Sequence, residues 1–459
     1  MMHRLTALTT IVLCGVAGLG RADEPVTLSL KDCLQRAVRS HPLLAAAQHD
    51  VEVAEADAAA MRAKLYPSVS ALVLTGPTPA AKGDAVTSTT PVNDYGYLLK
   101  NLGPFFHAEL TVTQPLYTFG KVAAGEAALT ELIGVRERQV DAQRWEVVTQ
   151  VKSVYYGLLL VRDLLALTDE VQGYVDQAKG YLEEHLKNED ADVTPIDRAK
   201  LTTYAAELKT QRIELKSRER ILTDALLRLV GAEPSAVVKL GEESLETVDV
   251  PELSTDALLA KALAGHPELA AAEHGTRALS LKRDATRAGY LPDLFVAGRA
   301  RYGVAPNREQ QKSPFAKDDF NFLDAGIALG LRYDLTLGVT SAELAKVTAE
   351  LEALDDKRRA LGERVSHDVL AALSDWHAAS DKIGATKEGF KAARAWCAFA
   401  QDGFELGTVS AKELIDALGA FVKARFALLQ VIYEYNVAVA RLSTAAGQEV
   451  VPELSSNGW

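Results

Sequence analysis

The sequence predicts an internally duplicated α+β membrane protein, in which each chain adds four β-strands to a shared transmembrane barrel and continues into long α-helices. Three observations lead to this prediction. The chain repeats itself once, each repeat contains strands whose side chains alternate in polarity, and helical sequence of unusual length follows those strands. The predicted fold therefore joins a membrane-crossing barrel to an extended helical part.

The repeat relates two halves of the chain. Residues 28–69 align without a gap with residues 253–294. The identical positions include His41–Pro42 with His266–Pro267 and Ala45–Ala47 with Ala270–Ala272. A period of roughly 225 residues far exceeds the period of a solenoid unit, about 20–50 residues. The predicted units are a signal peptide (1–22), a first repeat (23–231), a linker (232–252), a second repeat (253–447) and a C-terminal tail (448–459).

The first residues resemble a secretory signal. A weakly basic start, His3 and Arg4, precedes a mostly apolar stretch and a small-x-small cleavage site that ends at Ala22. The apolar stretch is too short to cross a bilayer, and no later run of 18 apolar residues exists. We therefore expect an exported chain that reaches the membrane through strands.

Composition argues against several other roles. The net charge of −12 disfavours binding to nucleic acid, which requires a basic face. The mature chain has two cysteines, Cys33 and Cys397, which lie in different repeats and fit neither a disulfide framework nor a metal site. The histidines near each His–Pro pair are spaced too far apart to favour metal binding. We expect neither a metal nor a cofactor.

Each repeat is predicted to contain, in order, a helix, a strand, a loop, a strand, a long helix, a turn and a return helix. In the first repeat the expected elements are a helix at 30–65, strands at 68–75 and 105–117 around a loop at 76–104, a long helix at 121–187 and a return helix at 195–230. In the second repeat they include a loop at 303–321, a strand at 323–333, a long helix at 341–406 and a return helix at 410–446. Because each return helix is shorter than its long partner, one long helix is expected beside two shorter helices stacked end to end.

The strands alternate with a period of two, which is typical of transmembrane β-strands. The polar positions expected to face a lumen are Glu109, Arg299, Arg301 and Arg332, and the apolar positions expected to face lipid are Leu110, Val112, Ile327 and Leu329. A half-buried strand of a soluble sandwich would alternate in the same way, so the helices must help to decide between the two.

The last helix indicates how the helices pack. Its main apolar stripe contains Leu414, Leu418, Phe421, Leu428, Ile432, Tyr435, Val439 and Leu442. A second stripe, Ile415, Val422 and Leu429, lies beside the first one. Two adjacent stripes predict contact with two neighbouring helices, as in the wall of a helical barrel. An ordinary helical bundle core is the alternative.

The strand number requires several chains to form one barrel. Open sheet edges cannot face lipid, and four strands cannot close into a barrel. Two chains would supply eight strands, which is too narrow for an aqueous pore, whereas three chains would supply twelve. The strand count therefore favours a trimer.

Two motifs then suggest a family. The stretch Gln114-Pro115-Leu116-Tyr117-Thr118-Phe119-Gly120 and the stretch from Phe404 to Ala417, with its Gly407–Thr408 turn, resemble the TolC-like outer-membrane efflux family. The resemblance covers nearly the whole mature chain. It implies a homotrimer in the outer membrane of a Gram-negative bacterium, with a barrel among outer-membrane lipid and a helical barrel in the periplasm. It also implies a passive conduit that works with a periplasmic adaptor and an inner-membrane transporter.

The resemblance also implies positions for a gate and for partner contacts. The family's closed tip narrows at acidic residues, which correspond here to Glu413 and Asp416. The alternative is a solvated helix start, where acidic residues also suit the helix dipole. Phe404 and Val409 occupy the positions of the family's polar latch and cannot form it. The expected adaptor-facing tip residues are Asp190, Asp192, Val193, Thr194, Gly407, Thr408 and Val409.

Two other classes of function compete with an export channel. A periplasmic adaptor or a coiled-coil structural protein of the cell envelope would also contain long helices, but an adaptor would carry one hairpin flanked by soluble β-domains. An exported enzyme is disfavoured because the sequence lacks Gly-x-Ser-x-Gly, His-Glu-x-x-His and phosphate-loop motifs. The sequence does not distinguish drugs, metals or proteins as cargo.

Overall fold

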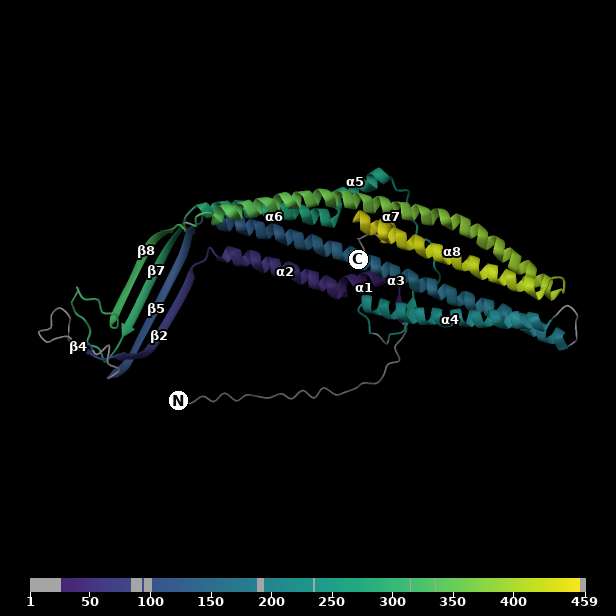
Figure 1. Ribbon diagram of the computed structural model, residues 1–459, viewed down its shortest axis with the longest axis horizontal. Helices are drawn as coiled ribbons and strands as arrows, with labels where there is room; N and C mark the ends of the chain where they lie inside the picture. Colours follow the sequence, from purple (N-terminus) through teal and green to yellow (C-terminus); the bar gives the residue numbers. More distant parts are fainter. Residues whose placement is uncertain are drawn as a thin grey trace, which may run out of the picture.

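The computed structural model describes residues 26–83, 93–94, 101–187, 194–233, 236–313, 315–334 and 336–454. These residues form an elongated molecule with a β-sheet at one end and two helical hairpin tips at the other (Figure 1). Between the two ends lies a layer of long, nearly parallel helices. None of the described helices contains a stretch that is long and apolar enough to cross a membrane.

One antiparallel sheet joins the two repeats. Its strand order is β2 (Ser68–Pro79), β5 (Leu102–Tyr117), β7 (Asp293–Val304) and β8 (Phe322–Arg332). Each repeat supplies one pair of neighbouring strands, and the β5–β7 pairing connects the repeats. Strands β2 and β8 are the edges of this sheet, so each pairs on one side only. The fold class predicted from alternation is confirmed at this level.

The first strand pair is longer than predicted. The region 76–104 was expected to be entirely loop, but pairing continues through Gly76–Phe105 and Pro77–Pro104 to Pro79–Leu102. Prolines are tolerated where a strand needs no donor on one side. Strand β2 is an edge strand, and Pro104 lies beyond the last pairing of β5 with β7 at Phe106. The short strands β3 (Ala81–Lys82) and β4 (Asn93–Asp94) extend the same end.

The first predicted helix of the chain is in fact two helices. Helix α1 (Leu30–Ser40) ends at His41, and α2 (Pro42–Ala63) begins at the next residue. The break occurs because proline lacks an amide hydrogen and suits the first position of a helix. The Nδ1 atom of His41 accepts the Leu43 amide at 3.3 Å, which caps α2.

The second repeat contains the same break between two helices, again at a His–Pro pair. Helix α5 (Thr255–Gly265) ends at His266, and α6 (Pro267–Arg287) follows, extended by the short η1 (Ala288–Tyr290). The Nδ1 atom of His266 accepts the Glu268 amide at 3.3 Å. The His–Pro pairs that the sequence aligns are therefore helix caps.

Two helices of 67 residues run through the molecule. Helix α3 (Lys121–Lys187) has the predicted bounds, and α7 (Val339–Glu405) differs from its prediction by a residue or two at each end. Each is about 100 Å long at 1.5 Å per residue. The return helices are α4 (Pro195–Leu229) and α8 (Ala411–Ala446). Helices α2 and α4 both pack against α3, while α6 and α8 both pack against α7, as predicted (Figure 1).

Helix α8 packs against two neighbours. It contacts both α7 and α3. All members of its predicted main stripe are buried: Leu414, Leu418, Phe421, Leu428, Ile432, Tyr435, Val439 and Leu442. The members of the second stripe pack against the same core, with Leu429 buried and Ile415 and Val422 partly buried. The expected contact with two helices is confirmed.

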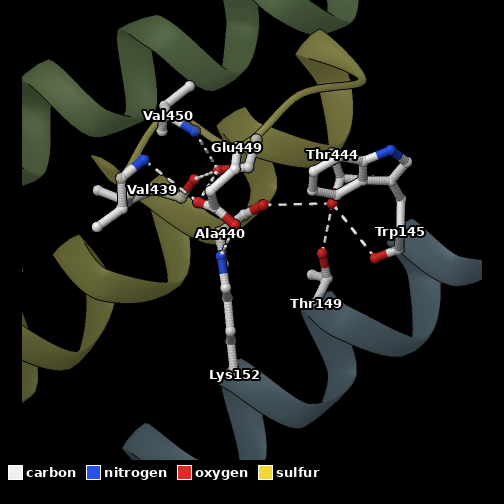
Figure 2. A network of polar contacts seen from close by, with 10 residues as sticks. Trp145, Thr149, Lys152, Val439, Ala440, Thr444, Glu449 and Val450 are labelled. Atoms are coloured by element: carbon white, nitrogen blue, oxygen red, sulfur yellow. Dashed lines mark hydrogen bonds and ion pairs between the residues drawn. The ribbon is translucent and has the colours of Figure 1, made fainter. Parts of the chain in front are cut away.

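A buried polar network ties the end of α8 to α3 (Figure 2). Lys152 Nζ lies 2.6 Å from Glu449 Oε2, and each of the two side chains is only 2% exposed. Ser443 Oγ donates to Glu449 Oε1 at 3.0 Å, and the hydroxyl of Thr444 bonds the hydroxyl of Thr149. Burial lowers the pKa of Lys152, while the carboxylate of Glu449 opposes this effect. The turn after α8 is thereby fixed to the middle of α3.

The segment that connects the repeats is fixed at the same level. The short strand β6 (Val238–Leu240) pairs in parallel with β1 (Val26–Leu28) near the start of the chain. Further along, Asp163 Oδ2 of α3 accepts the Leu245 amide at 2.9 Å. The Asn436 side chain of α8 accepts the Val248 amide at 3.0 Å and donates to the Glu246 carbonyl at 2.7 Å. These bonds hold the irregular connecting segment against the middle of α3 and α8.

Candidate functional site

The sheet has two chemically different faces. Residues that pair across neighbouring antiparallel strands share a face, and successive residues alternate between faces. The row Glu109, Arg301 and Asp324 therefore lies on one face, and the row Val69, Val112 and Ile327 lies on the other. By the same register the polar face contains Glu109, Arg299, Arg301 and Arg332, and the opposite face contains Leu110, Val112, Ile327 and Leu329.

Ion pairs organise the polar face. Arg301 donates two hydrogen bonds to Asp324, at 3.0 and 2.7 Å. At the helical end of the sheet, Asp293 lies 3.0 Å from Lys121 and 3.6 Å from Arg332. The two aspartates were not among the predicted site residues. Each lies opposite an arginine on the neighbouring strand, and this pairing becomes visible only once the strand register is known.

The other face exposes large apolar side chains. Ile327 is 85% exposed and Leu329 is 68% exposed. Their neighbours in the rows are also apolar, because Val69 and Val112 share the row of Ile327, and Val296 shares the row of Leu329. A continuous apolar face of this kind is unfavourable in water and suited to lipid or to another chain.

The tip of the second hairpin carries the predicted acidic pair. Glu413 and Asp416 are exposed in the first turns of α8, three residues apart and hence on one helix face. Ser410 caps the helix by accepting the Glu413 amide at 3.3 Å. Trp396 Nε1 of α7 donates to Glu413 Oε1 at 3.1 Å. The tryptophan was missed in the sequence because its partner lies across the hairpin turn.

The turn between α7 and α8 is closed by its own backbone. The Gly403 carbonyl accepts the amides of Thr408 and Val409 at 2.8 and 3.1 Å, and Gly407 has a φ of 69°. The left-handed conformation explains why glycine stands at position 407. Thr408 is exposed at this turn, whereas Val409 is partly buried against the helical core.

Phe404 joins the two hairpins instead of forming a polar latch. It is 5% exposed, and its ring centroid lies 4.4 Å from that of Tyr181 on α3. The contact is apolar and aromatic, so it holds without a hydroxyl–guanidinium bond. In the first hairpin, Thr194 caps α4 together with Asp197. The other predicted tip residues of this hairpin, Asp190, Asp192 and Val193, lie outside the described residues.

Within the described ranges, no group of three or more metal-ligand side chains comes together. Cys33 and Cys397 are buried free thiols, and burial raises the pKa of both, that of Cys33 to about 12. A thiol with a raised pKa is a poor nucleophile and a poor metal ligand. The chemistry of the described chain is therefore concentrated on the sheet faces and the hairpin tip.

Known proteins resemble the chain in both sequence pattern and fold. The family model described as outer membrane efflux protein matches residues 33–185 and 258–448, one segment in each repeat. The outer membrane protein VceC of Vibrio cholerae has a TM-score of 0.71 and 16% identity, over 91% of this chain and 96% of that chain. At this identity the similarity to a solved structure shows the fold alone.

Two further solved structures have a similar fold. The CmeC outer membrane channel of Campylobacter jejuni has a TM-score of 0.72 and 15% identity, over 91% of this chain and 85% of that chain. The open state of the MtrE outer membrane channel of Neisseria gonorrhoeae has a TM-score of 0.71 and 16% identity, over 91% and 88% of the two chains. By sequence alone, no curated protein matches the chain.

Proposed function

The chain belongs to the outer membrane efflux protein family, and from this premise we propose that three identical chains form one passive export conduit through the outer membrane. The family match confirms the resemblance to TolC-like proteins and identifies an outer-membrane export channel. The observation that carries the proposal is the sheet, whose polar and apolar faces fit a water-filled lumen on one side and lipid on the other.

The open edges of the protomer support a trimer. Strands β2 and β8 each leave one edge unpaired, which lipid cannot satisfy. Three sheets of four strands supply twelve strands, enough for an aqueous bore. The two sides of the helical layer also expose apolar residues that a neighbour would cover. They are Ile196, Ile213 and Ile221 on α4 and Leu370, Trp396 and Phe399 on α7.

The lumen of the barrel is assigned to the polar face. Glu109, Arg299, Arg301 and Arg332 would then contact water and cargo, and Leu110, Val112, Ile327 and Leu329 would contact outer-membrane lipid. The helices would extend into the periplasm, because the sheet lies at one end of the molecule and the hairpin tips at the other (Figure 1). This arrangement favours a channel over a periplasmic adaptor, which would not need a four-stranded sheet with an apolar outer face.

The hairpin tips are proposed to meet the partners. A periplasmic adaptor would contact the turns that include Thr194, Gly407, Thr408 and Val409, together with Asp190, Asp192 and Val193. An inner-membrane transporter would supply the energy and choose most of the cargo. Glu413 and Asp416 would line the periplasmic aperture, where three copies of an acidic pair favour cations over anions.

Fractionation and mass measurement test this proposal. We expect the mature chain in the outer-membrane fraction and, after extraction in detergent, a particle with the protein mass of three chains. Ile327→Arg should lower the amount of this particle, whereas the neighbouring Ala328→Arg, on the polar face, should not. A water-soluble periplasmic monomer would contradict the proposal.

A further inference from the structure

Aromatic side chains gather on the polar face of the sheet, near its loop end. The register places Leu74, His107, Gly303 and Phe322 in one row across the four strands, directly beside the row of Arg301. The rings of His107 and Phe322 lie 5.4 Å apart in an edge-to-face arrangement. One row further out, Phe105 meets Phe320 edge to face at 6.2 Å.

Gly303 makes this cluster possible. A methyl group at position 303 would lie 2.5 Å from Cε1 of Phe322 and 2.9 Å from the Phe320 carbonyl oxygen. Because glycine leaves this space free, the Phe322 ring lies across β7 and reaches His107 on β5. The three phenylalanines Phe105, Phe320 and Phe322, called here the aromatic collar, therefore form one surface that spans β5 to β8.

Guanidinium groups accompany the collar. The Arg301 guanidinium carbon lies 5.3 Å from the Phe322 ring centroid, and that of Arg308 lies 4.2 Å from the Phe320 centroid. Both distances are typical of cation–π contacts. The collar thus combines phenylalanine rings with two guanidinium groups, of which that of Arg301 is paired with Asp324.

Acidic and basic side chains balance beside the collar. Asp324 pairs with Arg301, and Glu109 lies 3.8 Å from the His107 imidazole. Glu109 and Arg299 add one acidic and one basic group to the same face, and Arg299 lies two rows away from the row of Phe322. The rings, rather than a net charge, therefore distinguish this part of the face.

We infer that the aromatic collar is a transit binding site for aromatic compounds at the outer end of the bore. The inference rests on the proposed lumenal assignment of the polar face. In a trimer, three collars would surround the exit. Stacking on the phenylalanine rings would select aromatic cargo. Binding of this kind is weak, so cargo is slowed and then released.

Single-channel recording of the purified protein in planar bilayers tests the inference. The probe is naphthalene-2-sulfonate, added to the side of the loops, and cyclohexanesulfonate is the matched non-aromatic anion. We expect naphthalene-2-sulfonate to reduce the current at a concentration about fivefold lower than cyclohexanesulfonate, since aromatic pairs add this order of selectivity. In Phe105→Leu/Phe320→Leu/Phe322→Leu the difference between the probes should disappear.

Phe295→Leu is the control variant. Phe295 lies on the same face near the helical end of β7, where its ring covers Gly330. This variant should keep the parent's preference for the naphthyl probe. If the triple variant does not form channels, the single variant Phe322→Leu replaces it in the test. This variant should reduce the preference for the naphthyl probe at least twofold.

Three results would overturn the inference. They are equal block of the parent by both probes, unchanged preference in the Phe322→Leu or triple variant, and loss of preference in Phe295→Leu. A parent protein that inserts without conducting ions would contradict the proposed channel itself, and with it the collar. Conduction without selective block would contradict only the collar.

Discussion

Two carboxylates are proposed to line the periplasmic aperture. Glu413 and Asp416 share an exposed helix face, and Glu413 is held by Trp396 across the hairpin. We expect Glu413→Ala/Asp416→Ala to raise single-channel conductance and to weaken both cation selectivity and block by divalent cations, because those ions require clustered carboxylates. Planar-bilayer recording beside the parent protein measures all three.

The control for the aperture neutralises other exposed acids of the same hairpin. Asp381→Ala/Glu388→Ala changes α7 well away from the tip and should leave conductance and divalent block as in the parent. Unchanged conductance, selectivity and block in Glu413→Ala/Asp416→Ala would place the aperture elsewhere, for example among the acidic residues 189–192.

His266 makes the start of α6 sensitive to acid. Burial, the largest cause, lowers its pKa below the usual value of 6.5, with Arg364 acting in the same direction and Glu268 and Asp368 opposing it. Below about pH 6.5 the unfolded chain therefore binds a proton that the folded chain resists, so stability falls as the pH falls. Protonation of Nδ1 would also remove the acceptor for the Glu268 amide.

Asparagine at position 266 keeps a capping acceptor without a titrating ring. We expect His266→Asn to lose less thermal stability than the parent between pH 7 and pH 5, measured as Tm in detergent. His41→Asn changes the corresponding, more exposed cap and should follow the parent. An identical acid dependence in His266→Asn and the parent would contradict this role.

At the scale of elements, the bounds of the long helices and of their return helices were predictable, whereas the break in the first helix and the length of the first strand pair were not. Gly120 has a φ of 85° and ends the strand before Lys121, so the start of the helix has a local cause. The helix expected at 30–65 breaks at Pro42 because proline also fits the first position of a new helix. Gly76 and Pro104 suggested a loop, but pairing at the sheet margin tolerates both.

The division of residues between the two sheet faces was predictable from period-two alternation. Alternation assigned Glu109, Arg301 and Ile327 to their faces, and the register agrees. The partners Asp324 and Trp396 depend on which residues meet across a strand pair or a hairpin, and the pattern of one segment contains no such information. The aromatic collar was missed for the same reason.

The two faces of β8 give a direct test at this scale. Arginine on the lipid face near the middle of the membrane costs roughly 2–4 kcal/mol. We expect Ile327→Arg to destabilise the assembled protein by about this amount, whereas Ala328→Arg, one residue further on the polar face, should cost much less. Urea unfolding in lipid vesicles measures the difference.

Cysteine labelling provides the independent check of the faces. A membrane-impermeant, water-soluble thiol reagent should label cysteines placed at Glu109 and Arg332 through the bore, but not those at Leu110 and Ile327. The reverse pattern would exchange the two faces and would contradict both the lumenal assignment and the collar.

At the scale of the whole molecule, the buried pair Lys152–Glu449 connects the C-terminal tail, directly after the second repeat, to the long helix of the first repeat. Removal of one partner leaves an uncompensated buried charge, which typically costs about 3–5 kcal/mol. We expect Glu449→Ala to cost this much in unfolding free energy. The double variant Lys152→Met/Glu449→Leu should recover most of the loss, because apolar replacement of a whole buried pair is often neutral.

Thermal and chemical unfolding of the detergent-extracted protein measure this coupling. Arg228→Ala/Asp224→Ala removes an exposed pair on α4 and should change stability by less than about 1 kcal/mol. If Glu449→Ala proves as mild as this control, the polar network of Figure 2 does not hold the repeats together.

The pairing of β5 with β7 has a consequence for the order of folding. The chain between the end of β5 at Tyr117 and the start of β7 at Asp293 contains 175 residues (118–292), so the loop that the two strands close is long and its entropy makes the contact slow to form. The helical hairpins and the two strand pairs within the repeats are local and can form first. The complete sheet contains strands from both repeats. Its continuous apolar face therefore forms only after both repeats have been exported.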